Sequence, residues 1–307
     1  MSNILVTGSH GQLGSELRYL VGSQGLRADN EIFFFTDKNT LNITENQAIE
    51  KYIQENHIDI IVNCAAYTAV DNAEENLIMA DAINREAVKS LAELSKKYDI
   101  KLIHISTDYL FDGNSYKPYT EDIQSNPQGV YSKTKLAGEQ EIKQVNPANA
   151  IIIRTSWIYS SFGHNFVKTM LRLGKEKESL NIVYDQVGTP TYARDLAQTI
   201  LEIIHQSHSS NENQGVEIYH YSNEGVCSWY DFAKAIFELS DVKCKVNPIE
   251  THQYPTPAKR PHYSILNKAK IKNRFNLEIP YWRDSLLSCL KSTQLDGSFV
   301  ANEGLNC

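Results

Sequence analysis

The chain has 307 residues, of which 41% are hydrophobic and 22% are charged, a balance typical of a folded globular protein rather than a disordered one. Lys and Arg number 30 and Asp and Glu number 37, for a net charge of -7, which argues against a broad surface for nucleic acid or anionic membrane. The five cysteines include no CxxC pair, so they indicate neither a disulfide framework nor a zinc signature. With no secretory signal and no apolar run long enough for a membrane helix, we expect a cytoplasmic protein with no nucleic-acid or membrane partner.

The first half of the chain alternates short apolar runs with longer amphipathic ones. Short apolar runs predict buried strands and amphipathic runs predict helices, so the alternation predicts an α/β fold. The expected sheet is parallel and doubly wound (Rossmann-like), with helices on both faces. Thr44 and Gln47 have the spacing of a capping box that opens one helix. The expected strands are 4–7, 31–36, 58–64, 101–106 and 150–155, and the expected helices are 12–21, 44–55, 74–98 and one that begins near 131.

The pattern is less regular after residue 157. We expect helices at 166–173 and 194–205 and a strand at 180–184, and the Pro-rich stretch 254–261 cannot be helical. The sequence therefore predicts two parts, a dinucleotide-binding domain and a smaller C-terminal substrate-binding lobe. The proposed bounds are 1–155 for the domain, with contributions from parts of 185–220, then 156–293 for the lobe and 294–307 for a polar, poorly ordered tail.

Three glycines follow the first predicted strand with the spacing GxxGxxG and open the first helix: Gly8, Gly11 and Gly14. Backbone amides at a helix N-terminus and the helix dipole favour a pyrophosphate there. Glycine permits positive φ, close approach of backbone to ligand and tight helix packing. With Gln12 and Leu13 between them, these glycines predict a dinucleotide site, although an ordinary Gly-rich turn has the same composition.

Asp37 ends the second predicted strand, 23 positions after Gly14. A carboxylate at this place accepts hydrogen bonds from ribose hydroxyls and favours NADH. Lys38 beside it is suited to a 2′-phosphate and favours NADPH instead. A turn aspartate is the third interpretation, so the sequence leaves the choice of nicotinamide open.

Tyr131 and Lys135 lie four positions apart at the start of a predicted helix, on one helix face. A free phenol has a pKa near 10, too high for acid–base work at neutral pH. A neighbouring ammonium lowers the pKa of such a phenol, so that it can protonate a carbonyl oxygen as hydride arrives at the carbon. A YxxxK pair is also common as an ordinary exposed pair of helical residues.

Two further segments lie at predicted strand ends, where a doubly wound sheet presents its ligand-binding edge. Thr107 and Asp108 end the fourth strand, and the Thr107 hydroxyl is a candidate to bond the same substrate oxygen as Tyr131. Ala65 and Ala66 follow the third strand, where small side chains let a cofactor lie close to the backbone. Together these signals predict a reductase site.

Taken together, these residues resemble the extended short-chain dehydrogenases, and within them the dTDP-4-dehydrorhamnose reductase family, over positions 3 to 290. TGSHGQLG and YSKTKLAGE are shared with many enzymes of nucleotide sugars, whereas the last four segments below are particular to this family. The segments are TGSHGQLG (7–14), VNCAAYTAVDNAE (62–74), HISTDYLFDG (104–113), YSKTKLAGE (131–139), RTSWIY (154–159), HNFVKTMLR (164–172), DQVGTPT (185–191) and YPTPAKRPHYSIL (254–266).

The resemblance implies reduction of the C4 ketone of a nucleotide-activated sugar by NADPH or NADH. Tyr131 then corresponds to the proton donor, Lys135 to the residue that adjusts its pKa, and Thr107 to the carbonyl partner. The implied cofactor contacts are Gly8, Gly11, Gln12, Leu13, Gly14, Asp37, Lys38, Ala65, Ala66, Thr68, Tyr131 and Lys135. The implied substrate contacts are Thr107, Asp108, Tyr131, Trp157, Asn165, Lys168 and Arg260.

Physical reasons support several of the substrate contacts. Trp157 offers a flat wall for a sugar face, although packing in the core explains it as well. Lys168 and Arg172 lie on one face of a predicted helix, either as a solvated edge or, with Arg260, as a set of cations that offsets a diphosphate. The histidines, His104 among them, are interpreted as packing or surface residues.

Some members of the family pair as dimers through magnesium held by acidic residues. Glu16 matches one such ligand, but Arg194 stands where a second acid is needed, so we expect no metal. A homodimer remains possible.

Two alternatives remain open. The first is a reductase or epimerase of another nucleotide-activated 4-keto sugar, which shares the fold and the Tyr131–Lys135 pair. The second is a non-catalytic regulatory subunit that keeps a bound dinucleotide, which does not require the intact set of Thr107, Tyr131 and Lys135.

Overall fold

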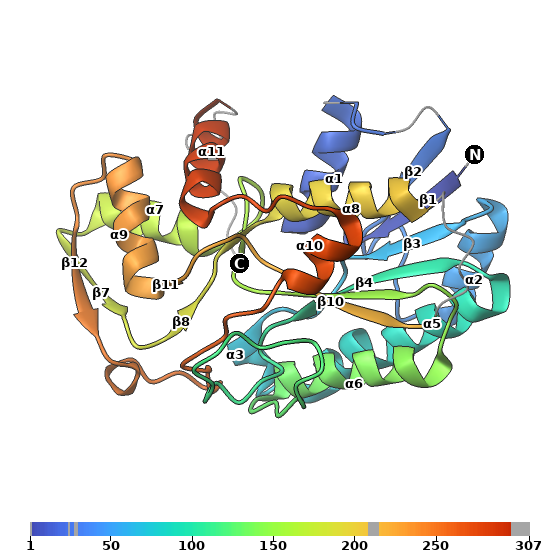
Figure 1. The fold of residues 1–307 in the computed structure, drawn as a ribbon, viewed down its shortest axis with the longest axis horizontal. Helices are drawn as coiled ribbons and strands as arrows, with labels where there is room; N and C mark the ends of the chain where they lie inside the picture. The colour runs from blue at the N-terminus through green and yellow to red at the C-terminus, as the bar shows by residue number, and fades with distance from the viewer. Residues whose placement is uncertain (1, 24, 28–29, 208–214, 296–307) are drawn as a thin grey trace.

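The computed structural model describes residues 2–23, 25–27, 30–207 and 215–295 (Figure 1). Across these ranges, six parallel strands form one sheet in the spatial order β10-β5-β4-β3-β1-β2. The chain runs outward from β1 to β2 and then returns to the other side of β1 to form β3, so the strand order reverses between β1 and β3. In a doubly wound fold this reversal marks the ligand-binding crevice. The strands are β1 (Ser2–Thr7), β2 (Glu31–Phe35), β3 (Ile60–Asn63), β4 (Lys101–Thr107), β5 (Ile151–Thr155) and β10 (Glu217–Tyr221).

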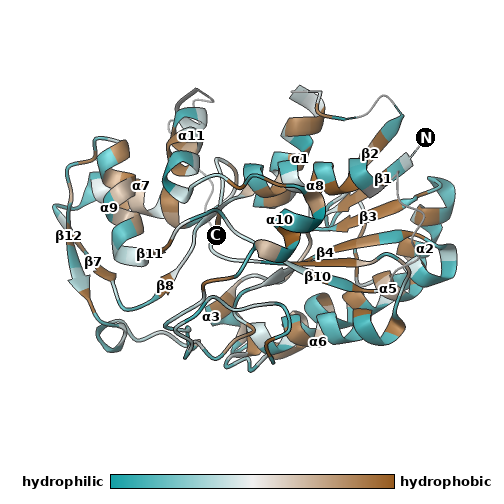
Figure 2. Cartoon of the chain, viewed as in Figure 1, coloured by the Kyte–Doolittle hydropathy of each residue, from teal (hydrophilic) through white to brown (hydrophobic). Residues whose placement is uncertain are grey.

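Both faces of the sheet are covered by helices, as the predicted doubly wound fold requires. Side chains alternate along a strand, so Ile4 and Val6 of β1 pack into one buried cluster while Leu5 packs into the other. Figure 2 shows hydrophobic strands at the centre with polar surfaces on the surrounding helices. One face carries α1 (Gln12–Ser23), α8 (Ala193–Ser207) and α10 (Ala269–Phe275), and the other carries α2 (Asn46–Glu55), α5 (Ala87–Tyr98) and α6 (Val130–Val145).

The C-terminal lobe has a core of its own, in which Phe232 is fully buried among aromatic side chains. Its helices stand apart from the main sheet, at the left of Figure 1, on the side toward which the carboxyl ends of the strands point. Short strand pairs join the lobe together: β7 with β12 in parallel, β8 with β11 antiparallel, and β6 with β9 in parallel. The elements are β6 (Ile158–Tyr159), α7 (Phe166–Glu176), β7 (Ser179–Val183), β8 (Val187–Gly188), β9 (Thr191–Tyr192), β11 (Cys227–Ser228), α9 (Trp229–Leu239), β12 (Lys245–Ile249), the 3-10 turn Thr251–Gln253 and α11 (Trp282–Leu295).

The chain passes between the two parts more than once. After β5 it enters the lobe, returns through α8 to add β10 beside β5, and then enters the lobe again. One of the two edge strands of the main sheet, β10, is therefore contributed from far along the sequence. Within the described residues, none of the helices has the length and apolar character needed to cross a lipid bilayer.

Two local expectations were wrong in part, and a third falls partly outside the described residues. The helix expected at 74–98 is present as a continuous helical run over 77–98, made of α4 (Leu77–Asp81), a π-helical turn at Ala82–Glu86 and α5, and the short α3 (Val70–Ala73) precedes it. Thr44 does not cap α2: Glu45 is the N-cap residue without a side-chain bond, and the Thr44 hydroxyl donates to the Asn42 side chain. Of the expected tail, residues 296–307 lie outside the described residues, whereas 294 and 295 belong to α11.

Candidate active site

The glycine turn brings the start of α1 against the loop that follows β3. Gly8 has φ of +66°, and a Cβ there would lie 2.7 Å from the backbone nitrogen of Ala65. A Cβ on Gly14 would lie 2.5 Å from the Gly8 carbonyl oxygen. Only glycine fits at these two positions, because any Cβ would collide with neighbouring backbone atoms. The N-terminus of α1 therefore stays open at the carboxyl edge of the sheet. The arrangement brings together the predicted cofactor residues of the turn and the loop.

Asp37 is bound within its own turn. Its Oδ1 accepts hydrogen bonds from the backbone amides of Asn39 and Thr40 and from the Thr40 hydroxyl, while Oδ2 lies 2.9 Å from His10 Nδ1. Hydrogen bonds from Thr40 are the main reason that the pKa of Asp37 is lowered. These contacts support the interpretation of Asp37 as a turn aspartate. Lys38 next to it is exposed.

Helix α6 begins one residue before Tyr131, and its first turn is held by a side chain from another element. The Val130 amide donates to Glu74 Oε1 at 2.8 Å. Gly129 precedes the helix, and a Cβ there would lie 2.9 Å from the same Glu74 oxygen. Glu74 therefore satisfies one of the free amides at the start of the helix that carries Tyr131.

Tyr131, Thr107 and Asp108 converge beyond the end of β4. The Thr107 hydroxyl donates to Asp108 Oδ1 at 3.2 Å, and the Thr107 side chain is close enough to the Tyr131 phenol to influence its pKa. Burial raises the pKa of Tyr131 to about 12, with the Thr107 side chain acting in the opposite direction. Burial likewise raises the pKa of the Asp108 carboxyl to about 7. Among the described residues Asp108 Oδ2 is buried without a hydrogen-bond partner and has acceptor capacity to spare, while the Ser264 side chain offsets part of the rise in the pKa of this carboxyl.

Lys135 lies one helical turn further along α6, and it is only 1% exposed. Its Nζ donates to the Ile105 carbonyl oxygen at 2.7 Å and lies 3.3 Å from His104 Nε2. Burial lowers the pKa of Lys135 to about 8. Burial raises the pKa of the Tyr131 phenol, and Lys135 is not among the groups that shift it, so the lowering expected from this ammonium stays a prediction.

Trp157 occupies the turn after β5 with φ of +46°, an uncommon conformation for a bulky residue. Its indole stacks on Trp229, with ring centroids 3.7 Å apart and planes within 11°. A Cβ on Gly188 would lie 2.8 Å from the Trp157 ring. The packing interpretation of Trp157 thus has direct support, and backbone strain of this kind is concentrated at functional sites.

Asn165 connects the two parts of the molecule. Its side-chain oxygen caps α7 by accepting from the Lys168 amide, and its Nδ2 donates to Gln12 Oε1 at 3.0 Å. Gln12 belongs to the glycine turn, so the start of α7 is fixed against the start of α1. The predicted substrate residue Asn165 therefore lies next to the predicted cofactor residue Gln12.

The cations expected around a diphosphate are not gathered in one cluster. Lys168 is half-buried and lies near Cys289 of α11. Arg260 instead forms a bidentate ion pair with Asp71 of α3, with Nη1–Oδ1 and Nη2–Oδ2 distances of 3.0 and 2.7 Å. Arg172 pairs with Glu176 on the exposed face of α7, as expected for a solvated edge.

Glu16 is fully buried and already has two partners. Its carboxylate accepts from Arg194 Nε at 2.7 Å and from the Ser160 hydroxyl at 2.7 Å. The guanidinium of Arg194 also lies over the Tyr19 ring. Arg194 thus neutralises the carboxylate that the family resemblance suggested as a metal ligand. The expectation that no metal binds here stays a prediction.

Tyr109 was not predicted as a site residue, and His104 was predicted only as a packing or surface residue. The Tyr109 ring meets the Tyr131 ring edge to face at a centroid distance of 6.2 Å, and Arg260 influences the Tyr109 pKa. Tyr109 therefore lies against Tyr131 and near Arg260 and Asp71. Its place directly after Ser-Thr-Asp at a strand end was the available signal.

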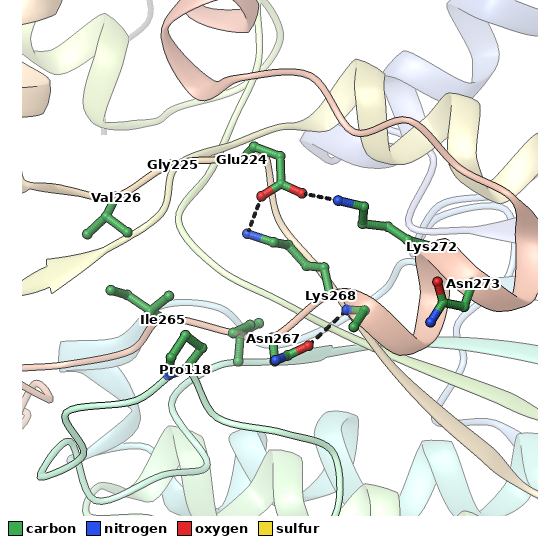
Figure 3. A pocket seen from close by; sticks show the side chains of 11 residues that line it. Pro118, Glu224, Gly225, Val226, Ile265, Asn267, Lys268, Lys272 and Asn273 are labelled. Carbon is green, nitrogen blue, oxygen red and sulfur yellow. Dashed lines mark hydrogen bonds and ion pairs between the residues drawn. The ribbon is translucent and has the colours of Figure 1, made fainter.

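A separate pocket of about 480 Å³ lies beyond the end of β10, beside α10 (Figure 3). Lys268 and Lys272 point into it, and both bind the Glu224 carboxylate, at 3.2 and 2.8 Å. This carboxylate offsets much of their positive charge. None of the predicted catalytic, cofactor or substrate residues lines this pocket, so it is not the candidate active site.

Comparison with known proteins bears on this site directly. The family model described as RmlD substrate binding domain matches residues 1–295. The chain belongs to this family. The dTDP-4-dehydrorhamnose reductase of Sinorhizobium fredii is 38% identical over 298 residues, which cover 96% of this chain and 98% of the relative. The family expected from the sequence is thereby confirmed.

Solved structures of family members agree with this fold over nearly the whole chain. A dTDP-4-dehydrorhamnose reductase from Clostridium acetobutylicum superposes with a TM-score of 0.87 at 40% identity, covering 95% of this chain and 99% of that one. The dTDP-4-dehydrorhamnose reductase from Bacillus anthracis, solved in complex with NADP, also has a TM-score of 0.87, at 37% identity, with 95% and 100% covered. The predicted doubly wound fold is confirmed by these neighbours.

Proposed function

We propose that this chain is a dTDP-4-dehydrorhamnose reductase that reduces the C4 ketone of dTDP-4-dehydro-L-rhamnose to dTDP-L-rhamnose with NADPH or NADH. Membership of the family supports the reaction class. The observation that carries the proposal is the convergence of Thr107, Asp108 and Tyr131 at the carboxyl edge of β4. That edge lies in the same sheet as the glycine turn after β1, where a doubly wound fold binds its ligands.

The residues of the glycine turn fit a nicotinamide dinucleotide. Gly8 and Gly14 allow backbone approach that any Cβ would block, and α1 presents its free N-terminal amides beside them. Gly11, Gln12, Leu13, Ala65, Ala66 and Thr68 complete the proposed cofactor contacts. Bound there, the dinucleotide supplies hydride to the carbonyl carbon. Asp37 and Lys38 are proposed to face the adenosine ribose.

Tyr131 is the proposed proton donor. Its raised pKa keeps the phenol protonated at neutral pH, so it is ready to give a proton to an oxygen that becomes an alkoxide as hydride reaches the carbon. The Thr107 hydroxyl, which lies beside the Tyr131 phenol, is proposed to hold the same oxygen. Lys135 is buried behind them, where it is proposed to return a proton to the phenolate after each turnover.

The substrate is proposed to lie between the domain and the lobe. Asp108 offers a buried acceptor oxygen for a sugar hydroxyl, and Trp157 and Asn165 are proposed to border the sugar. Arg260 is proposed to leave Asp71 for the diphosphate, with Lys168 contributing charge from α7. Residues 1–155, with parts of 185–220, form the proposed cofactor-binding domain, and 156–293 mainly form the substrate lobe.

The test is oxidation of NADPH and of NADH, followed by their absorbance, with a panel of nucleotide-activated 4-keto sugars. The proposal expects the highest kcat/KM with dTDP-4-dehydro-L-rhamnose. Preference for a different base or sugar would favour the first alternative. Cofactor binding without turnover of any sugar would favour the regulatory subunit.

A further inference from the structure

A line of buried polar groups crosses the main sheet from the cofactor loop to Lys135. The Ala65 amide donates to Thr7 Oγ1 at 3.4 Å, and the Thr7 hydroxyl donates to Asn63 Oδ1 at 2.7 Å. Asn63 Nδ2 lies 3.0 Å from His104 Nδ1, and His104 Nε2 lies 3.3 Å from Lys135 Nζ. Apart from the Ala65 end, every side chain in this line is at most 1% exposed. These groups must therefore satisfy one another.

The direction of hydrogen bonding in this line is fixed at one end. A backbone amide can only donate, so Thr7 Oγ1 accepts from Ala65 and has one hydrogen left to give. That hydrogen goes to Asn63 Oδ1, which turns the Asn63 amide nitrogen towards His104. An amide nitrogen donates, so His104 Nδ1 must be the acceptor. A neutral imidazole then carries its single hydrogen on Nε2, the atom that faces Lys135.

His104 is held neutral by its surroundings. It is fully buried, and burial together with the nearby Lys135 keeps the pKa of His104 well below its usual value. The reverse direction of bonding is less satisfactory, because Thr7 Oγ1 would then accept from both Ala65 and Asn63. Its own hydrogen would have no acceptor in this line.

We propose that Asn63 and His104 form a positioning pair that directs the His104 Nε2–H at Lys135 Nζ and so favours the free amine of Lys135 over its ammonium. An N–H bond can be accepted by a free amine but opposes an ammonium at the same place. The pair therefore helps Lys135 release a proton. In turnover, Lys135 gives a proton to the Tyr131 phenolate, which leaves a neutral amine and a neutral phenol, and the amine regains its proton from water.

Other groups around Lys135 act on the same equilibrium. Glu139 lies one turn further along α6 and favours the ammonium, but its carboxylate is held by a buried ion pair with Arg154 of β5 at 2.7 Å. Tyr131 lies one turn before Lys135 on the same helix. The effect proposed for His104 of β4 adds to the effects of Glu139 and Tyr131 on the protonation of Lys135. Its part in turnover rests on the proposed function, whereas the state of the imidazole does not.

The first experiment reads the imidazole directly in the whole chain. Protein labelled with ¹⁵N at histidine is followed by NMR from pH 5 to pH 9, and the His104 signal is assigned as the one lost in His104→Gln. We expect a neutral ring with hydrogen on Nε2 across this range. Hydrogen on Nδ1, or an imidazolium that titrates in this range, would overturn the proposal. If the variant does not fold, through-bond assignment in the wild-type chain gives the same answer.

The second experiment reads Lys135 through the pH dependence of kcat for ketone reduction. In His104→Phe, which removes the N–H, we expect the basic limb of the profile to move to higher pH by about one unit. His104→Gln retains an amide N–H and should stay close to wild type. A shift to lower pH in His104→Phe would contradict the proposal. Absence of reductase activity combined with the expected NMR result would refute the proposed function alone.

Discussion

Asp71 of α3 and Arg260 of the Pro-rich loop form a bidentate ion pair that ties the C-terminal lobe to the part of the chain that holds the main sheet. Asp71 Oδ1 also accepts from the Ala258 amide, so the carboxylate holds the loop at two points. Arg260 is at the same time the cation proposed to meet the substrate diphosphate. The Asp71 carboxylate therefore holds the Arg260 guanidinium in place, and a bound diphosphate would compete with Asp71 for it.

Replacing Arg260 tests this role. Arg260→Ala should raise KM for the nucleotide sugar by about 10- to 100-fold, the cost of losing one charge-assisted bidentate contact, while KM for the nicotinamide changes little. Arg283→Ala is the matched control, because Arg283 pairs with Glu238 elsewhere in the lobe. Steady-state kinetics with each substrate varied in turn decides the matter. Equal increases in both KM values would show that Arg260 does not face the diphosphate.

Removal of the Tyr131 hydroxyl should stop the chemistry while leaving the fold intact. Tyr131→Phe is expected to lower kcat by at least about 100-fold, since it deletes only the general acid. Nicotinamide affinity, measured by fluorescence titration, should stay near the wild-type value. Tyr116→Phe is the control, because Tyr116 is exposed at the surface. Wild-type turnover in Tyr131→Phe would remove this phenol from the mechanism.

The buried Asp108 carboxyl should make stability depend on pH. Burial raises its pKa from 3.8 to about 7, so the folded chain binds more protons than the unfolded chain between these values. Stability from this group is therefore lost as pH rises through that window. Asp108→Asn removes this loss. Its free energy of unfolding should exceed that of wild type by about 4 kcal/mol at pH 8 and differ little near pH 4.

Urea unfolding at the two pH values measures this difference. Asp112→Asn is a control of opposite sign, because a hydrogen bond from the Asn114 amide lowers the pKa of Asp112 and stabilises its charged form. That variant should be less stable than wild type at pH 8. An Asp108→Asn variant that is also less stable at pH 8 would show that the carboxylate is better satisfied than its unpartnered Oδ2 indicates.

Two glycines of α1 should respond in opposite ways to the same substitution. Gly14→Ala places a Cβ against the Gly8 carbonyl and should destabilise the fold by more than about 1 kcal/mol and weaken nicotinamide binding. Gly22→Ala meets open space in the same helix and should be neutral or stabilising by up to about 1 kcal/mol. Thermal unfolding and cofactor titration on both variants give the comparison. Equal behaviour of the two would mean that close packing at Gly14 is unimportant.

Glu74 should influence catalysis through the helix that it caps. Glu74→Ala is expected to cost on the order of 1 kcal/mol of stability and to lower kcat several-fold, because Tyr131 follows the capped amide directly. Glu74→Gln keeps an acceptor oxygen and should recover most of the loss. Glu75→Ala, at an exposed neighbouring position, is the control. A kcat unaffected in Glu74→Ala, despite lower stability, would restrict Glu74 to a structural role.

Patterns of short range predicted the sheet well, because apolar periodicity and glycine spacing are local properties. The five expected strands and the helices after β1 and before β5 appear close to their predicted positions. The long helix expected at 74–98 appears at 77–98, but its π-helical turn was not predicted. Asn84 in that turn bonds the Tyr67 backbone and the Thr134 hydroxyl, partners that periodicity cannot reveal. Strand β10 was missed for a related reason, because its pairing partner β5 lies some sixty residues earlier.

The candidate site, like the fold, could be predicted from the sequence only in part. The Tyr131, Lys135 and Thr107 set was recognisable from spacing, and the sheet topology brings these residues to one edge. Two features of the site were not accessible from sequence. Burial raises the pKa of Tyr131, and His104 Nε2 lies 3.3 Å from Lys135 Nζ. Both depend on which groups are excluded from water, a property of the folded chain.

The return of the chain to add β10 has a consequence for any attempt to divide this protein. A fragment ending near residue 156 would lack α8 and β10, so the backbone of β5 would become an unpaired edge, and an apolar face of the sheet would be open to solvent. Such a fragment is expected to aggregate rather than to bind dinucleotide on its own. The two parts are thus interwoven by the path of the backbone, and a single proteolytic cut would not release either one as a self-sufficient unit.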